Sequence, residues 1–154
     1  MIGIALGQLD ISLSELLFEW TLEDEEWLLS EFGRQPSLAE VISYIQTYEG
    51  IGCEWKVWFE EEEAIAITCV LNQAPSNLQA WLGTIVVRPD KRNSGRGSSV
   101  IKSETKRYRP VIFAGIPYNR NEWSMFLGKC GFDQYGIEES PEETFLIFVK
   151  PSEE

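Results

Sequence analysis

The chain has 154 residues, a formal net charge of −12, three widely spaced cysteines and no histidine, so we expect a single domain over residues 1–154 in a reducing, cytoplasmic setting. The acidic balance argues against a nucleic-acid partner, and the apolar stretches fall far short of the ~20 residues of a transmembrane helix, so no membrane insertion is expected. Without histidine there is no Ser-His-Asp catalysis and no His-ligated zinc, and the cysteine spacing matches no metal site, so we expect no metal.

The first part of the chain has the pattern of one strand followed by helices. Residues 2–9 are short, apolar and glycine-containing, which is typical of a first strand. Residues 13–20 carry leucines and a tryptophan at helical spacing. Thr21 with Asp24 predicts a capping box that restarts a helix, and this helix is expected to end at Gly33.

A further helix is predicted by its start signal, its stop signal and its period. Ser37 with Glu40 at the third position opens it, and Gly50 ends it. Its apolar positions share one face, formed by Leu38, Val41, Ile42, Ile45 and Tyr48.

The periodicity changes after this helix. Residues 53–59 alternate polar and apolar side chains, the four glutamates 60–63 follow, and residues 64–71 are apolar. This pattern predicts a hairpin with a solvated tip, although the glutamates would also suit a rim for a cationic substrate. A turn at residues 72–77 leads to residues 79–87, whose nearly uninterrupted apolar character predicts a strand buried on both faces.

A basic segment follows this strand. Residues 88–109 hold eight basic and two acidic residues, whereas the rest of the chain holds five basic and 23 acidic ones. Positive charge gathered in an acidic chain favours an anionic ligand at that place, with a solvated basic helix face as the alternative. Glycines at positions 95 and 97 precede a predicted helix over residues 98–109, where backbone N–H groups and the helix start would bind an anion.

The last part of the chain alternates strands and a helix. A strand is expected over residues 110–118, a helix over residues 121–132 that stops at Gly131, and two strands over residues 132–140 and 143–150. Strand, helices, three strands, helix, strand, helix and two strands together indicate a mixed α/β domain.

Two common phosphate-binding motifs are excluded at the glycines. A dinucleotide fingerprint needs glycine where Val100 stands, and a Walker loop needs Gly-Lys-Ser/Thr. The segment instead resembles the acyl-CoA loop of the GNAT superfamily of N-acetyltransferases, which is an apolar strand, then Val-x-Pro-x-x-Arg/Gln-x-x-Gly-x-Gly/Ala, then a helix. Every place in that pattern is filled here, by Val87, Pro89, Arg92, Gly95 and Gly97.

A second segment is similar to the same family. Asn121 and Ser124, followed by Lys129-x-Gly131-Phe132, resemble the family's helix that ends in Gly-Phe. The resemblance implies an α/β fold with a GNAT-like mixed, mostly antiparallel central sheet of about six to seven strands flanked by helices. The order of predicted elements agrees with that fold.

The resemblance also implies an activity. The family transfers an acetyl group from acetyl-CoA, as co-substrate, to a primary amine of a small molecule or peptide by direct attack on the thioester. The loop amides would hold the pyrophosphate, with charge added by Arg92 and Arg96, and the Ile85 N–H would polarise the thioester carbonyl. The residues expected to bind acetyl-CoA are Ile85, Val87, Arg92, Asn93, Ser94, Gly95, Arg96, Gly97, Ser98 and Asn121.

Two departures from the family concern proton transfer. Many relatives have a tyrosine as general acid five residues before the Gly-Phe phenylalanine, where this chain has Leu127. We assign that role to Tyr118, with Tyr135 or unassisted departure of the thiolate as alternatives, and with a partly buried structural role as the alternative for either tyrosine. The strand over residues 79–87 has no carboxylate, so a base would come from the glutamate-rich N-terminal helices through water, or the amine would enter neutral.

The acceptor side is the least defined by the sequence. Four aromatic residues of the N-terminal helices would form either core or one wall of the acceptor pocket, namely Trp20, Trp27, Tyr44 and Tyr48. The acidic surface outside the basic segment favours a cationic, amine-bearing acceptor, and we allow for a homodimer. The alternative function is a non-catalytic acyl-CoA-binding or protein-interaction module with a degenerate active site.

Overall fold

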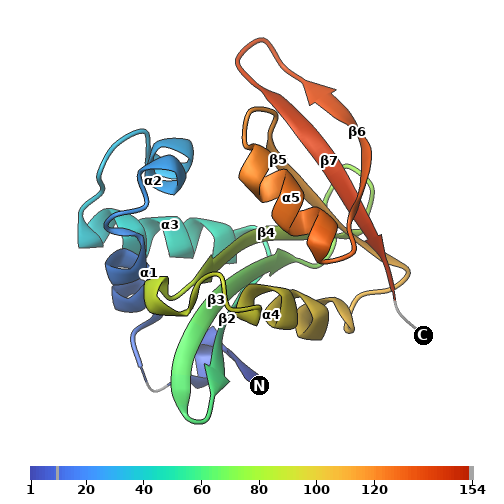
Figure 1. Ribbon diagram of the computed structural model, residues 1–154. Coiled ribbons are helices and arrows are strands. Elements are labelled where there is room, and N and C mark those ends of the chain that lie inside the picture. The colour runs from blue at the N-terminus through green and yellow to red at the C-terminus, as the bar shows by residue number, and fades with distance from the viewer. Residues whose placement is uncertain (10, 153–154) are drawn as a thin grey trace. The chain divides into compact units, whose positions relative to one another are not determined.

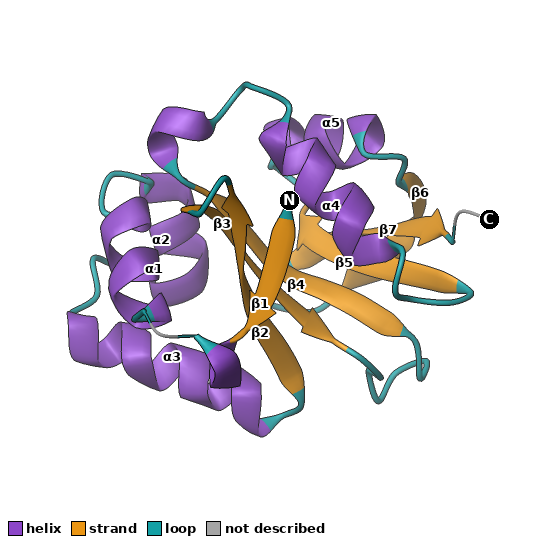
Figure 2. Ribbon diagram, turned by 90° about the horizontal axis from the view of Figure 1, so that it is seen from below, coloured by secondary structure: helices purple, strands orange, loops and turns teal. Residues whose placement is uncertain are grey.

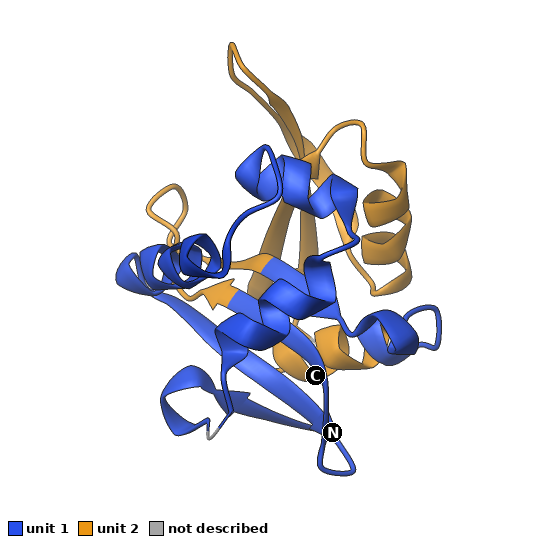
Figure 3. Cartoon of the chain, turned by 90° about the vertical axis from the view of Figure 1, so that its left-hand side faces the viewer, with its two compact units in different colours: residues 1–69, 84–97 blue, residues 70–83, 98–154 orange. Residues whose placement is uncertain are grey.

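The computed structural model describes residues 1–9 and 11–152, so residues 10 and 153–154 of the expected domain lie outside the described part. The chain divides into two compact units (Figure 3). Unit 1 holds residues 1–69 and 84–97, and unit 2 holds residues 70–83 and the chain from residue 98 onward. A single domain over residues 1–154 stays a prediction.

The observed order of elements is the order that the sequence predicts (Figure 1). The described residues form β1 (Ile2–Ala5), the 3-10 helix η1 (Leu6–Gln8), α1 (Leu13–Thr21), α2 (Glu25–Phe32), α3 (Leu38–Gly50), β2 (Cys53–Glu60), β3 (Glu63–Leu71), β4 (Ala80–Val87), the 3-10 helix η2 (Pro89–Lys91), α4 (Arg96–Thr105), β5 (Val111–Pro117), α5 (Asn121–Lys129), β6 (Asp133–Glu139) and β7 (Thr144–Pro151).

The strands form a seven-stranded sheet in the order β1-β2-β3-β4-β5-β7-β6. β1 pairs antiparallel with β2, and β7 pairs antiparallel with both β5 and β6. β4 and β5 run parallel, with residues 80–82 opposite residues 112–114. This mixed, mostly antiparallel sheet with its helices confirms the predicted fold class.

The capping signals before α2 are only half confirmed. Asp24 is the cap, because its Oδ1 accepts the backbone N–H of Trp27 at 3.2 Å, and Gly33 ends the helix with a left-handed φ of 74°. Thr21 is no cap. It is the last residue of α1, and its hydroxyl donates to the Leu17 carbonyl oxygen at 2.7 Å, which takes the hydroxyl away from the next helix.

The capping box at the start of α3 is confirmed in full. The Glu40 N–H donates to Ser37 Oγ and the Ser37 N–H donates to Glu40 Oε1, both at 3.2 Å. Arg34 adds a bidentate contact to the same carboxylate, with nitrogen–oxygen distances of 3.1 and 2.5 Å. A local reciprocal motif of this kind needs no tertiary contact to form.

The core of unit 1 lies where α3 packs against β2. Figure 2 shows α1, α2 and α3 grouped on the side of the sheet where β2 lies. Val41 and Ile45 of α3 are buried, and the indole N–H of Trp55 donates to the Ile45 carbonyl oxygen at 3.2 Å. The predicted apolar face is too wide, because Leu38 and Ile42 are exposed. The helix contacts β2 through Ile45 and through the rings of Tyr44 and Tyr48, which pack against Trp55.

Two strand predictions are wrong in part. Residues 2–9 are not one strand, because β1 ends at Ala5 and the Leu9 N–H donates to the Leu6 carbonyl oxygen at 3.2 Å, which closes a turn. β4 is not buried on both faces. Its even-numbered residues are buried and its odd-numbered residues are more exposed, which is the alternation of a strand with one covered face.

Unit 2 has its own apolar core, formed by residues of α4, β5, α5 and β7 that include Val100, Ile101, Ile112, Leu127 and Ile147. α4 ends at Thr105, before the predicted end at residue 109, so Lys102 lies in its last turn and the cations from Lys106 onward follow the helix. Gly131, which follows the cap residue Cys130 of α5, has a φ of 95° and confirms the predicted stop. Over the described residues, we find no helix with the length and apolarity to cross a membrane.

The ion pair at the start of α3 makes part of the stability depend on pH. The Arg34 guanidinium, the Ser37 backbone N–H and the Ser37 hydroxyl lower the pKa of Glu40 from 4.5 to about 2. A depressed folded-state pKa stabilises the fold above the unfolded-state value, and this contribution is lost as the pH falls from 4.5 to about 2. In urea denaturation, we expect the difference in the free energy of unfolding between wild type and Glu40→Gln to shrink over that range. A difference that is constant with pH would contradict the assignment.

Candidate active site

The end of β4 presents backbone N–H groups on one edge. The Arg88 N–H donates to the Ile65 carbonyl oxygen of β3 at 2.8 Å. Because the N–H groups of successive residues in a strand point to opposite edges, those of Ile85 and Val87 point away from β3. These are the two groups expected to contact the thioester and the pantetheine arm, and their side chains need only be apolar.

The loop between β4 and α4 turns on two residues with a left-handed backbone. Asn93 has a φ of 59° and Gly95 a φ of 81°, and asparagine and glycine are among the residues that adopt this conformation most readily. α4 begins at Arg96, directly after Gly95, and the first N–H groups of a helix lack intrahelical acceptors and carry partial positive charge. The space beside Gly95 is open, since a Cβ there would meet no atom within 4 Å. Loop and helix start together have the geometry of an anion site.

Arg92 connects this loop to the N-terminal helices. Its Nε–H donates to the Val87 carbonyl oxygen at 2.9 Å, and a terminal N–H contacts the Trp20 carbonyl oxygen at 3.4 Å. The other terminal nitrogen lies 3.6 Å from the carboxylate of Asp24, which is also the cap of α2. The charge of Arg92, which the family resemblance assigns to the pyrophosphate, is therefore shared with a carboxylate in this structure.

Two further arginines of the basic segment are paired with the β2–β3 hairpin. Arg96 lies 2.9 Å from Glu60, and Arg88 donates to Glu63, whose pKa it lowers. The two glutamates between them form the turn and have positive φ values. Only the centre of the glutamate run is thus a solvated tip, and its ends hold the loop. The signal for these ion pairs in the sequence is that the glutamates 60–63 and the basic segment 88–109 carry opposite charges.

The other predicted site residues belong to unit 2. Tyr118 follows β5, is 60% exposed, and its N–H donates to the Thr144 carbonyl oxygen at 3.0 Å. Tyr135 of β6 is 70% exposed, and its ring lies 5.5 Å from that of Phe113. Both side chains are therefore more exposed than the alternative of a partly buried structural tyrosine expects, although Tyr135 keeps its ring contact with Phe113. Asn121 is exposed at the start of α5.

Leu127 and the cysteine next to the helix end have structural surroundings. Leu127 is buried in unit 2, which explains why an apolar residue stands there. Ser98 Oγ lies 3.5 Å from Cys130 Sγ, and burial raises the pKa of the Cys130 thiol, so this thiol is not activated. Within residues 1–9 and 11–152, no group of three or more His, Cys, Asp or Glu side chains is arranged to hold a metal ion.

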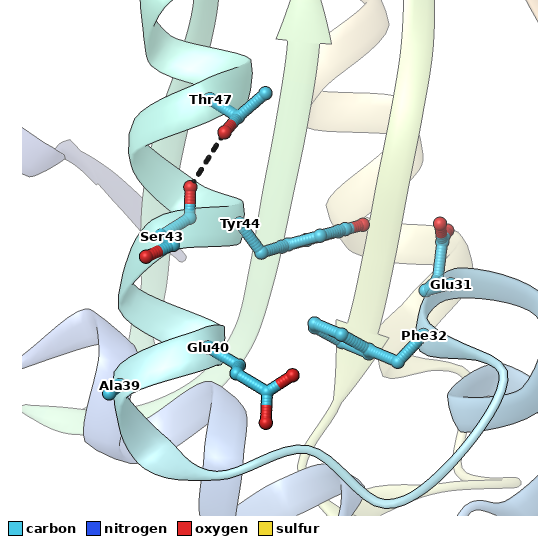
Figure 4. Close-up of a pocket in the computed structure, with 7 residues that line it drawn as sticks. All are labelled: Glu31, Phe32, Ala39, Glu40, Ser43, Tyr44 and Thr47. Carbon is cyan, nitrogen blue, oxygen red and sulfur yellow. Dashed lines mark hydrogen bonds between the residues drawn. The ribbon is translucent and has the colours of Figure 1, made fainter.

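The aromatic residues of the N-terminal helices divide between core and surface. Trp20 and Trp27 are buried and belong to the core. The ring centroids of Tyr44 and Tyr48 are 4.8 Å apart, and Tyr44 also lines an open hollow between α2 and α3 (Figure 4). Burial raises the pKa of Tyr44 far above its ordinary value, and the nearby Glu31 carboxylate adds to this effect, so the phenol is neutral. Sequence reasoning missed Glu31, because nothing distinguishes it from the other glutamates of α2.

The sequence is similar to that of a curated bacterial protein over most of its length. No known family model matches the chain. The chain is 35% identical over 129 residues to the uncharacterized protein YkzC of Bacillus subtilis strain 168, in a match that covers 81% of this chain and 88% of that protein.

Solved structures that are similar to this chain include acetyltransferases. An acetyltransferase from Thermus thermophilus has a TM-score of 0.74 at 16% identity and covers 98% of this chain and 97% of its own. The aminoglycoside acetyltransferase AAC(6')-Ib, solved with acetyl-CoA and an aminoglycoside, has a TM-score of 0.72 at 13% identity over 90% of this chain and 87% of its own. A chimera of the spermidine N-acetyltransferase SpeG from Vibrio cholerae and hSSAT has a TM-score of 0.65 at 12% identity. The match covers 98% of this chain and 96% of the chimera.

The two functions of Asp24 are separated by a pair of variants. Asp24→Asn keeps an oxygen for the α2 cap, whereas Asp24→Ala removes it and should lower the free energy of unfolding by ~1 kcal/mol. In Asp24→Asn, Arg92 loses its carboxylate partner, so the affinity for inorganic pyrophosphate should rise by up to about fivefold, the value of a partly exposed ion pair. Urea denaturation and titration calorimetry measure the two effects. Glu25→Gln removes a neighbouring charge as the control, and an equal rise in that variant would show that overall charge, not Arg92, sets the affinity.

Proposed function

We propose that the chain, which has the fold of solved GNAT-family acetyltransferases and belongs by its sequence to the family of YkzC, is an N-acetyltransferase that uses acetyl-CoA. The acceptor is a primary amine of a small molecule or peptide. The amine nitrogen attacks the carbonyl carbon of the thioester and the carbon–sulfur bond breaks. The amine loses one proton, and the departing thiolate takes one up. The enzyme acts in the cytoplasm as a monomer or homodimer.

The observation that carries this proposal is the strand, loop and helix start from Ile85 to Gly97. The left-handed backbone at Asn93 and Gly95 turns the chain directly into α4, whose first N–H groups face outward from the helix end. An anion there is stabilised mainly by backbone dipoles, because Arg92 and Arg96 already contact carboxylates. We assign the pyrophosphate of acetyl-CoA to these amides, from Arg92 to Ser98, with Asn121 as a further contact.

The edge of β4 supplies the electrostatic part of the proposed mechanism. The N–H of Ile85 would donate to the thioester carbonyl oxygen and stabilise the negative charge that develops on it during attack. The N–H of Val87 would pair with the pantetheine arm. Both are backbone groups of a regular strand, so they are preorganised and need no side-chain rearrangement.

We assign to the phenol of Tyr118 the role of donating a proton to the departing sulfur. Leu127 is buried and apolar, so it donates no proton. The exposure of Tyr118 is compatible with a phenol that contacts a bound ligand, and the same is true of Tyr135, which remains the alternative donor.

The buried Leu127 also favours a second candidate, an acyl-CoA-binding or protein-interaction module that has lost its chemistry. Binding of CoA does not separate the two functions. Turnover with a panel of amines does, because a module releases no free CoA thiol from acetyl-CoA in the presence of any amine. A panel that includes 2-phenylethylamine, spermidine and an aminoglycoside would cover the acceptor classes.

Acetyl-CoA should raise the melting temperature. At about 100 times the dissociation constant the gain in stability is ~2.7 kcal/mol. Gly97→Asp should abolish this shift, because its carboxylate would repel the pyrophosphate while an acidic residue in the first turn of α4 is compatible with folding. Gly97→Asn has nearly the same size without the charge and should lose less. A Gly97→Asp protein that folds and still shows the full shift would remove the pyrophosphate from this loop.

Tyr118→Phe should reduce turnover by roughly 10²-fold if the phenol protonates the sulfur. The melting temperature and its shift with acetyl-CoA should stay as in wild type, because the side chain is exposed and its fold contact is made by the backbone. Tyr135→Phe is the matched control and should retain turnover. The reverse pattern would assign the proton to Tyr135, and full turnover in both variants would leave water as the donor.

A further inference from the structure

The Ile85 N–H, the proposed oxyanion donor, lies on a part of β4 that has a strand partner on one edge only. The ladder between β4 and β5 joins residues 80–82 to residues 112–114, and within the described part of the chain it extends no further. β3 pairs with the other edge of β4, where the Arg88 N–H donates to a β3 carbonyl oxygen at 2.8 Å. The orientation of the Ile85 peptide therefore depends on that edge and on the side chains that pack against the face of the strand.

The peptide group that carries this N–H begins at Thr84. A peptide group is planar, so the direction of the Ile85 N–H follows from the backbone positions of Thr84 and Ile85. Thr84 is 7% exposed, and its Oγ1 lies 3.5 Å from the hydroxyl of Tyr44 on α3. A buried hydroxyl is costly to leave without a partner, so this contact, although long, favours one orientation of Thr84.

The packing of the Tyr44 ring holds its hydroxyl in place. The ring lies at centroid distances of 4.8 to 6.0 Å from four other aromatic rings, those of Trp27, Phe32, Tyr48 and Trp55. Edge-to-face contacts of this kind favour a defined ring orientation. Figure 4 shows Tyr44 extending away from α3, with its hydroxyl at the far end of the ring. The hydroxyl is thus a fixed polar atom beside β4.

The phenol of Tyr44 is a hydrogen-bonding group and not an acid or a base. Burial raises its pKa far above the ordinary value, so the phenol keeps its proton. Its polar contact is with the Thr84 side chain, which belongs to unit 1 as Tyr44 does. The assignment of the proton at the sulfur to Tyr118 is unaffected.

From these contacts we propose that Tyr44 is a positioning residue: through Thr84, its hydroxyl holds the peptide group whose N–H stabilises the oxyanion. This inference rests on the proposed N-acetyltransferase function and adds a residue to its mechanism. A donor that is already aimed at the developing charge needs no reorganisation during the reaction. Without the Tyr44 hydroxyl, the peptide would turn more freely on the edge that has no strand partner, and the oxyanion would be stabilised less.

Two variants each remove one hydroxyl of this contact and nearly keep the shape of the side chain, namely Tyr44→Phe and Thr84→Val. On the full chain, with an amine of the panel that wild type acetylates, each should lower kcat about tenfold, less than the roughly 10²-fold that a misplacement of about 1 Å can cost. KM for acetyl-CoA should stay as in wild type, because the loop amides proposed to hold the pyrophosphate do not change. An equal fall in kcat and kcat/KM is the sign of an interaction made only in the transition state.

Three comparisons separate positioning from a general loss of stability. In the double variant Tyr44→Phe/Thr84→Val, the loss of kcat should equal that of one single variant, since both changes remove the same contact. Thr84→Ser keeps the hydroxyl and should retain kcat. Tyr108→Phe is the matched control and should also retain kcat, because it removes a phenol hydroxyl whose contact, to Glu104 at 3.4 Å, does not involve β4.

A spectroscopic measurement tests the same contact without turnover. A hydrogen bond to a carbonyl oxygen polarises the carbonyl group and lowers its stretching frequency. With acetyl-CoA that carries an isotopic label at the thioester carbonyl, wild type should lower the infrared frequency of this group relative to free acetyl-CoA. Tyr44→Phe and Thr84→Val should lower it less, and Tyr108→Phe should lower it as wild type does.

Three results would overturn the inference: wild-type kcat and carbonyl frequency in Tyr44→Phe, additive losses of kcat in the double variant, or an equal loss in Tyr108→Phe. Each of them leaves the proposed function intact as long as wild type acetylates some amine of the panel. Failure of the proposed function itself would appear as no turnover of wild type with any amine. The infrared comparison of wild type with Tyr44→Phe then decides the positioning role by itself.

Discussion

The arrangement of the candidate site depends on the contacts that the guanidinium of Arg92 makes. It bonds to a carbonyl oxygen at the end of β4, to one in the last turn of α1, and to the carboxylate that caps α2. Carbonyl groups at a helix end lack intrahelical donors, so a cation there satisfies an acceptor and the negative end of the helix dipole together. One side chain thereby fixes the loop before α4 relative to the helix that lines the hollow.

Some acidic residues of the chain form ion pairs with arginines of the candidate site. Glu60, Glu63 and Asp24 compensate the arginines that flank the glycines of the loop. The start of α4 and the backbone of the loop add positive potential that does not depend on these arginines. Backbone groups keep their geometry when side chains vary, which suits a site defined by glycines and by the end of a strand.

The same reasoning applies to the acceptor side. β4 carries no carboxylate, so any negative group near the point of attack has to come from another element. Glu31 of α2 is one carboxylate of another element that lines the hollow, and it adds to the effect of burial that raises the pKa of Tyr44.

Local signals in the sequence determined the order of the elements, the capping box of α3, the glycine stops after α2 and α5, and the loop between β4 and α4. Each depends on residues within about one helical turn, where backbone sterics and short side-chain contacts dominate. The predictions failed where a local signal had a tertiary competitor. The Thr21 hydroxyl donates to a carbonyl oxygen within α1, and one face of β4 stays more exposed although its sequence is almost entirely apolar.

Only the tertiary structure decided which carboxylates meet which arginines, that Tyr118 and Tyr135 are exposed, and that Glu31 faces Tyr44. Asp24 and Arg92, or Glu60 and Arg96, are far apart along the chain, and no periodicity or cap connects them. Charged side chains of one kind are interchangeable in a sequence pattern. What distinguishes them is the distance to a partner and the burial around it, and both quantities exist only after the chain has folded.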